Sequence, residues 1–221
     1  IDAWLNNSAD KNLWPSFDWK EPLPLQVDIG FVDNPYRAEQ RLLTIDLSTD
    51  PLVVFGAAGR GKTTFVKLLA GIEKPDVGVS PMQADSSVSY KPQYISAAYR
   101  GTVEQLLRSL AKDEFGSGWF KTEIMQPLDL DPLMERDVSE LSGGELQRIA
   151  ISACLSKKAL VYLLDEPSAY LDVEERLAMA RAIRRVVETR NALAFVVEHD
   201  VVAQDFIADE LMIFTGDSGV K

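Results

Sequence analysis

The stretch Leu52-Val-Val-Phe-Gly-Ala-Ala-Gly-Arg-Gly-Lys-Thr63 places the pattern G-x-x-x-x-G-K-[ST] between a short apolar run and a helical segment. Glycines in such a loop let consecutive backbone N–H groups turn inward around a β-phosphate, which side chains would obstruct. We predict a buried strand at 52–55 and a helix at 62–70 that ends at Gly71. Strand, phosphate loop and helix in this order predict an α/β P-loop NTPase core.

The phosphate loop also predicts individual roles. Lys62 is expected to reach the β- and γ-phosphates of a nucleotide, and the Thr63 hydroxyl to hold Mg²⁺. The alternative is a glycine-rich turn with an accidental lysine, which the flanking strand and helix disfavour. The nucleotide-binding residues predicted here are Gly56, Ala57, Ala58, Gly59, Arg60, Gly61, Lys62, Thr63 and Thr64.

A second apolar run, 160–164, leads directly into Asp165 and Glu166. Two carboxylates at the end of a buried strand are costly unless a cation or hydrogen bonds receive them. By itself this pattern is also an ordinary strand-to-turn junction. In a P-loop ATPase the first carboxylate holds Mg²⁺ and the second polarises the attacking water, so we assign these roles to Asp165 and Glu166.

The remaining pattern alternates strands and helices. Thr102 with Gln105, and Asp172, are expected to cap helices, the second with a buried face that includes Val173. The other predicted strands lie at 42–47, 87–90, 193–197 and 211–214, and a last helix begins near residue 201. We predict one domain over 1–221: an antiparallel β portion near the N-terminus, a parallel α/β core, and an inserted helical subdomain at about 95–156.

Composition narrows the function. The formal net charge is −11 and the pI is near 4.6, which argues against sequence-specific or broad nucleic-acid binding, because that needs clustered Lys and Arg. No run approaches the ~18 apolar residues of a membrane helix, so no membrane insertion is expected. Cys154 is the only cysteine and is expected to be a buried hydrophobe. A cytoplasmic location fits this cysteine usage.

A further segment, Leu141-Ser-Gly-Gly-Glu-Leu-Gln-Arg148, presents a hydroxyl and two glycines at a helix start. Alone it is also typical of any capped helix after a turn. Combined with the other motifs, it resembles the signature of the ATP-binding-cassette family. The resemblance spans about 50–215. It implies that Ser142, Gly143 and Gly144 bind the nucleotide of a second cassette, in a longer chain or a homodimer.

The same resemblance assigns the remaining motifs. Gln93 looks like the Q-loop glutamine that senses Mg²⁺ and the γ-phosphate, and residues 168–172 look like the D-loop. His199, the only histidine, looks like the switch histidine. The resemblance therefore implies Glu166, His199, Lys62 and Gln93 as catalytic residues, Thr63, Gln93 and Asp165 as magnesium ligands, and ATP and Mg²⁺ as cofactors.

Four strings resemble one branch, the soluble ribosome-recycling ATPases or RNase L inhibitor family, in its second nucleotide-binding domain. They are Tyr90-Lys-Pro-Gln-Tyr-Ile-Ser96, Arg100-Gly-Thr-Val-Glu-Gln-Leu-Leu107, Leu141-Ser-Gly-Gly-Glu-Leu-Gln-Arg148 and Tyr162-Leu-Leu-Asp-Glu-Pro-Ser-Ala-Tyr-Leu-Asp172. In that family two cassettes and an iron–sulfur domain share one chain, and ATP-driven closure helps to split ribosomes. The resemblance implies the small ribosomal subunit as a partner through the full-length protein.

Some residues depart from the family pattern. Ala57 and Ala58 replace the more usual Glu and Asn of the loop, and Arg60 is unusual, so nucleotide affinity is open. An aromatic residue is expected to stack on adenine; Phe17 is our candidate, with Trp14 and Trp19 as alternatives, although these rings are also typical core residues. One cysteine cannot ligate a four-iron cluster.

Two other functions stay open from the sequence. A transporter's energising subunit would carry the same motifs, but it would not be expected to have the tyrosine at position 170. A non-hydrolysing ATP-gated clamp is the second alternative, against which the intact Glu166 and His199 argue. A basic cluster at Arg181, Arg184 and Arg185 is either a local RNA contact or the solvated face of its helix.

Overall fold

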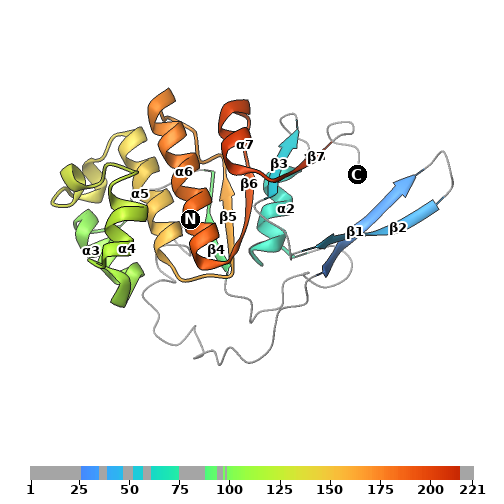
Figure 1. Ribbon diagram of the computed structural model, residues 1–221, viewed down its shortest axis with the longest axis horizontal. Helices are drawn as coiled ribbons and strands as arrows, with labels where there is room; N and C mark the ends of the chain where they lie inside the picture. Colours follow the sequence, from blue (N-terminus) through green and yellow to red (C-terminus); the bar gives the residue numbers. More distant parts are fainter. Residues whose placement is uncertain are drawn as a thin grey trace.

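The computed structural model describes residues 26–34, 39–46, 52–56, 61–74, 88–93, 97 and 99–214. Two sheets are present in this part of the chain (Figure 1). Strands β1 (Gln26–Asn34) and β2 (Glu39–Asp46) form an antiparallel hairpin with a register shift at Asp28/Gly30. The predicted N-terminal antiparallel portion is confirmed, and its strand at 42–47 corresponds to β2.

The core is a five-stranded sheet in the order β4-β5-β6-β3-β7, and every pairing in it is parallel. Its strands are β3 (Leu52–Gly56), β4 (Val88–Lys91), β5 (Val161–Asp165), β6 (Leu193–Val197) and β7 (Glu210–Phe214). The bounds of β6 match the prediction, and the described ends of the other strands lie within two residues of it. The predicted parallel α/β core is therefore confirmed.

Side chains from alternate strand positions pack on opposite faces of this sheet. Val54, Val161 and Leu163 pack with Val66 and Leu69 of α2 (Lys62–Leu69) on one face. On the other face Val53, Tyr162, Leu164 and Val196 belong to a larger core, which includes residues of α5 (Gly143–Ser156) and α6 (Val173–Arg190). Helix α7 (Val201–Ile207) packs against α6. The sheet is thus covered on both faces, as parallel strands require.

Residues 103–156 are mostly helical, as predicted. Helix α3 (Val103–Ala111) begins with the expected capping box of Thr102 and Gln105, and it packs against α5. Short turns connect these two helices: η2 (Lys112–Glu114), α4 (Gly118–Phe120), the π-helical η3 (Lys121–Met125), η4 (Asp131–Leu133) and η5 (Val138–Glu140). Phe120, Ile124 and Leu130 are fully buried and fill the centre of this segment.

Two predictions about side chains have different outcomes. Cys154 is fully buried, and burial raises the pKa of its thiol to about 11, as expected of an inert cysteine. Val173 was expected on the buried face of its helix, which is wrong: it is 71% exposed. The reason is its position as the first residue of α6, directly after the Asp172 cap and beyond the reach of the core. None of the described helices is long and apolar enough to span a membrane.

Candidate nucleotide-binding site

Several of the predicted phosphate-binding and catalytic residues that the structure describes lie at one edge of the sheet, where the parallel strands end. Helix α2 begins at Lys62, after Gly61, whose φ of 87° lies in the left-handed region that favours glycine. The N-cap residue, Gly61, has no side chain that could accept from the first backbone N–H groups of α2. The first backbone N–H groups of α2 are therefore available to phosphate oxygens, in the manner of helix starts that bind anions.

Lys62 is buried with only 5% of its surface exposed. Burial lowers the pKa of its ammonium, and the nearby carboxylates of Glu166 and Asp165 act in the opposite direction. The lysine is thus held close to the two acids that the sequence assigned to the same site. The predicted residues Gly56 and Thr64 border this helix start as the last residue of β3 and the third residue of α2.

Asp165 ends β5 and is fully buried. Burial raises the pKa of its carboxyl, and the Thr63 hydroxyl is close enough to lower it. Even so, among the residues that the structure describes, no donor reaches either carboxylate oxygen with both the distance and the angle of a hydrogen bond. An unsatisfied buried carboxylate beside a hydroxyl suits a hard cation that prefers oxygen ligands, so the residues present fit Mg²⁺.

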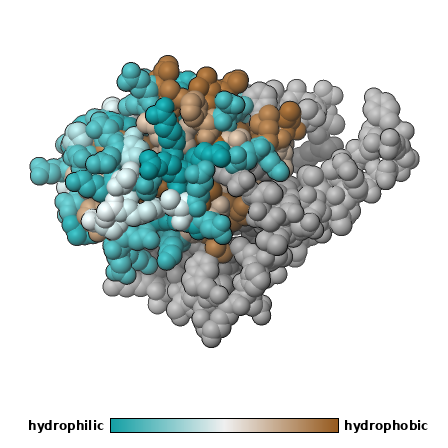
Figure 2. Space-filling view, in the orientation of Figure 1, coloured by the Kyte–Doolittle hydropathy of each residue, from teal (hydrophilic) through white to brown (hydrophobic). Residues whose placement is uncertain are grey.

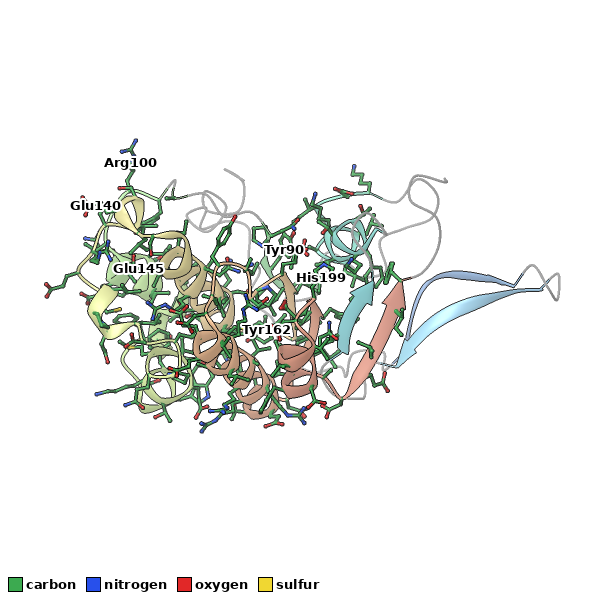
Figure 3. The ribbon with its side chains drawn as sticks, turned by 90° about the horizontal axis from the view of Figure 1, so that it is seen from above. Tyr90, Arg100, Glu140, Glu145, Tyr162 and His199 are labelled. Atoms are coloured by element: carbon green, nitrogen blue, oxygen red, sulfur yellow. The ribbon has the colours of Figure 1, made fainter. Side chains whose placement is uncertain are left out.

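Glu166 and His199 come from different strand ends and meet at this edge. The Nε2 atom of His199 lies 3.3 Å from Oε1 of Glu166. The backbone N–H of Glu166 also donates to the carbonyl of Val197, the last residue of β6. Figure 3, which views this edge from above, shows His199 near the centre of the molecule. Both residues were predicted to act on the γ-phosphate, and the structure brings them into contact.

Gln93 lies two residues beyond the end of β4 and is half-buried. Since β4 pairs with β5 in parallel, Gln93 lies at the same strand edge as Asp165. The predicted residues Ala57, Ala58, Gly59, Arg60 and Phe17 fall outside the described residues.

The signature residues form the start of α5. Ser142 caps the helix, and its hydroxyl and the Glu145 carboxylate make a reciprocal capping box. Arg136 holds the Glu145 carboxylate at 2.5 Å. Ser142 and Gly143 are exposed, and Gly144 is half-buried. Figure 3 shows Glu145 on the helical segment, well to one side of His199. The signature therefore faces solvent. It lies away from the edge of the sheet at which His199 is found.

Three buried polar side chains near the site were missed by the sequence analysis. Lys91 and Glu198 are fully buried, and Gln147 is 1% exposed. Burial lowers the pKa of Lys91 to about 8, against the raising effect of Asp165 and other acids, and burial raises the pKa of Glu198. The available signals were a lysine inside a buried strand and a glutamine on the inner face of the signature helix.

The comparisons agree with these motifs. A family model described as ABC transporter matches residues 44–169. An uncharacterized ABC transporter ATP-binding protein of Methanocaldococcus jannaschii is 54% identical over 75% of this chain and 27% of its own length. The translation initiation factor RLI1 of Saccharomyces cerevisiae is 44% identical over 75% of this chain and 27% of its own length. The chain thus spans about a quarter of these relatives.

Two solved structures are similar over most of the chain. A structure named RNase-L Inhibitor has a TM-score of 0.75 and 49% identity, covering 82% of this chain and 34% of that one. A complex of the archaeal ribosomal stalk protein aP1 with the ribosome recycling factor aABCE1 gives a TM-score of 0.77 and 43% identity, covering 95% of this chain and 40% of that one. On its motifs, its fold and these likenesses, the chain belongs to the ATP-binding-cassette ATPases and, among them, to the RNase L inhibitor family.

Proposed function

We propose that the chain binds MgATP and hydrolyses it to ADP and phosphate, and that the site is completed by a second cassette. The observation that carries this proposal is the contact between Glu166 and His199, 3.3 Å apart, beside the unsatisfied carboxylate of Asp165. A structural ion pair would not need an adjacent buried carboxylate that, among the described residues, has only the Thr63 hydroxyl near it.

The residues divide the work between binding and chemistry. Lys62 and the N–H groups at the start of α2 bind the phosphates, and Thr63, Gln93 and Asp165 hold Mg²⁺. When bound, the cation offsets negative charge on the β- and γ-phosphates. Glu166 accepts a hydrogen bond from the attacking water and draws its proton, while His199 orients both the carboxylate and the γ-phosphate.

A second cassette is needed because Glu145, at the start of the signature helix, lies well to one side of His199. Ser142 and Gly143 would bind the nucleotide of the partner, which is either a second copy or another cassette of a longer chain. Exposed apolar side chains support such a face. Tyr170, Val173, Val201 and Val202 are each more than half exposed. Figure 2 shows hydrophobic residues gathered over the ends of α6 and α7, at this edge of the molecule.

We place the activity in ribosome recycling. The relatives that support this are named as a translation initiation factor and as a ribosome recycling factor, and a ribosome-bound archaeal ABCE1 model is 50% identical to the chain. The small ribosomal subunit would be reached through the full-length protein, in the cytoplasm. A transporter subunit has less support, since a zinc import ATP-binding protein of Ehrlichia canis is only 28% identical.

The test is phosphate release from ATP with and without Mg²⁺, measured over a range of protein concentrations. Turnover per chain should rise with concentration, because two weakly associating cassettes must meet before either site is complete. Ser142→Arg should abolish turnover while leaving ATP binding by the single chain intact. The matched control is Thr122→Arg, at an exposed position of η3. Constant turnover per chain on dilution, from a monomer, would exclude the shared site.

A further inference from the structure

The buried side chain of Lys91 lies next to the end of β5, where Asp165 and Glu166 are found. Its Nζ atom donates to the backbone carbonyl of Asp165 at 2.9 Å and to that of Glu166 at 3.1 Å. The ammonium therefore bonds the backbone of the two acids and not their carboxylates. The Glu166 carboxylate instead contacts the imidazole of His199.

Gln147 reaches the same backbone from the signature helix. Its Nε2 atom donates to the carbonyl of Glu166 at 3.0 Å and to that of Pro167 at 2.8 Å. The Glu166 carbonyl thus receives side-chain donors from two separate elements, β4 and α5. The backbone N–H of Ala169 also donates to this carbonyl, at 3.4 Å. One hydrogen bond is enough to satisfy a carbonyl, so the additional donors fix its direction.

The backbone of Glu166 is in a conformation that needs such support. Its φ is +47°, in the left-handed region that is unfavourable for residues other than glycine. A residue stays in this region only where its surroundings over-determine it. The carbonyl belongs to the peptide between Glu166 and Pro167. Its donors prevent that peptide from rotating, and so help to keep Glu166 in the conformation that holds its carboxylate against His199.

We propose that Lys91 and Gln147 are positioning residues that clamp the Glu166 carbonyl and so hold the Glu166 carboxylate against His199. These hydrogen bonds connect three motifs: the Q-loop, the signature and the acidic end of β5. Lys91 precedes Gln93 of the Q-loop by two residues, and Gln147 follows Ser142 of the signature by five. A change at the Q-loop or at the signature thereby reaches the catalytic carboxylate through hydrogen bonds to one peptide. The predicted effect on hydrolysis rests on the proposed function. The predicted position of the Glu166 carboxylate does not.

The test compares Lys91→Met and Gln147→Leu with the parent chain and with Ser89→Ala. Ser89 is a matched control: it is buried on the same strand as Lys91, and its hydroxyl bonds the carbonyl of Cys154, away from the catalytic edge. Thermal unfolding selects the variants that fold. The two readouts are kcat with KM for MgATP, and the NMR chemical shift of the imidazole, which is unambiguous because the chain has one histidine.

Both clamp variants should lower kcat by about 10- to 100-fold with a much smaller change in KM, as expected when a catalytic group is misplaced by about 1 Å. They should also move the imidazole shift in the direction that Glu166→Gln moves it, while Ser89→Ala leaves both readouts at the parent values. In a Glu166→Gln background, Lys91→Met should lower kcat no further.

The outcomes separate this inference from the proposed function. Folded clamp variants with the imidazole shift of the parent overturn the inference, whatever their turnover. A parent chain that releases no phosphate under any condition overturns the proposed function, and the imidazole shift still decides whether the clamp positions Glu166. Loss of stability with an unchanged shift would show that Lys91 and Gln147 serve packing alone.

Discussion

The backbone carbonyl of Tyr170 lies 3.1 Å from the position that a Cβ on Gly144 would take. Tyr170 itself has a φ of +65°, and its ring lies 3.6 Å from the corresponding position on Gly143. The D-loop therefore crosses directly over the signature of its own chain. Because the carbonyl is backbone, it cannot move aside as a flexible side chain would.

This close approach predicts different tolerances at the two glycines. Gly144→Ala should be less stable than Gly143→Ala by about 1–3 kcal/mol, because the added methyl overpacks against the D-loop carbonyl. Gly143→Ala meets only ordinary contacts and gains helix propensity of up to about 1 kcal/mol. Urea unfolding of both variants measures the difference. Equal stability would show that the D-loop shifts freely.

The sequence predicted the site because its motifs sit at strand ends, and parallel strands bring their carboxyl ends together. The structure brings Asp165, Glu166 and His199 together at one edge of the sheet, and the roles that the sequence assigned to them stay predictions. It could not reveal Lys91 and Gln147, since these residue types are usually exposed and only the packing of β4 and α5 against β5 buries them. The contact of Tyr170 with the signature likewise depends on residues about 26 positions apart.

Glu166→Gln should keep MgATP binding and lower hydrolysis by about 10²–10⁴-fold, the usual cost of losing one general base. The amide retains the size of the side chain and its reach to His199, but it cannot take a proton from water. Steady-state phosphate release, with nucleotide affinity measured separately, checks both parts. Glu174→Gln, in the exposed first turn of α6, is the control. Parental turnover in the Glu166 variant would remove Glu166 from the base role.

Arg190, at the end of α6, contacts residues of the mostly helical stretch 103–156. We expect it to contribute more to the free energy of unfolding than other arginines of α6. Its side chain is 9% exposed and donates to the carbonyls of Leu155 and Lys157, while its guanidinium lies 4.1 Å from the ring centre of Trp119. Arg190→Met should lower the free energy of unfolding by about 2–4 kcal/mol, because two partly buried carbonyls lose their donor.

Arg181→Met is the matched control on the same helix. Arg181 is exposed and lies over the Phe206 ring at 5.7 Å, so its loss should change stability by no more than about 0.5 kcal/mol. Chemical unfolding of both variants gives the comparison. A similar small effect for Arg190→Met would mean that water replaces its hydrogen bonds without cost.

The last prediction concerns the ribosome. With a net charge of −11, residues 1–221 tested alone should bind small subunits weakly, because rRNA phosphates repel them and no tethered module raises their effective concentration in that assay. Arg184 and Arg185 do not offer a free basic patch: Arg184 pairs with Glu188 and Asp209, and Arg185 pairs with Glu123 at 2.9 Å. Replacing both arginines with alanine should therefore leave any residual binding unchanged.

Cosedimentation with small subunits and a non-hydrolysable ATP analogue, at low and high salt, tests this. Tight, salt-resistant binding by the parent chain would overturn the multi-module argument, and loss of binding in the double variant would assign these arginines an RNA contact.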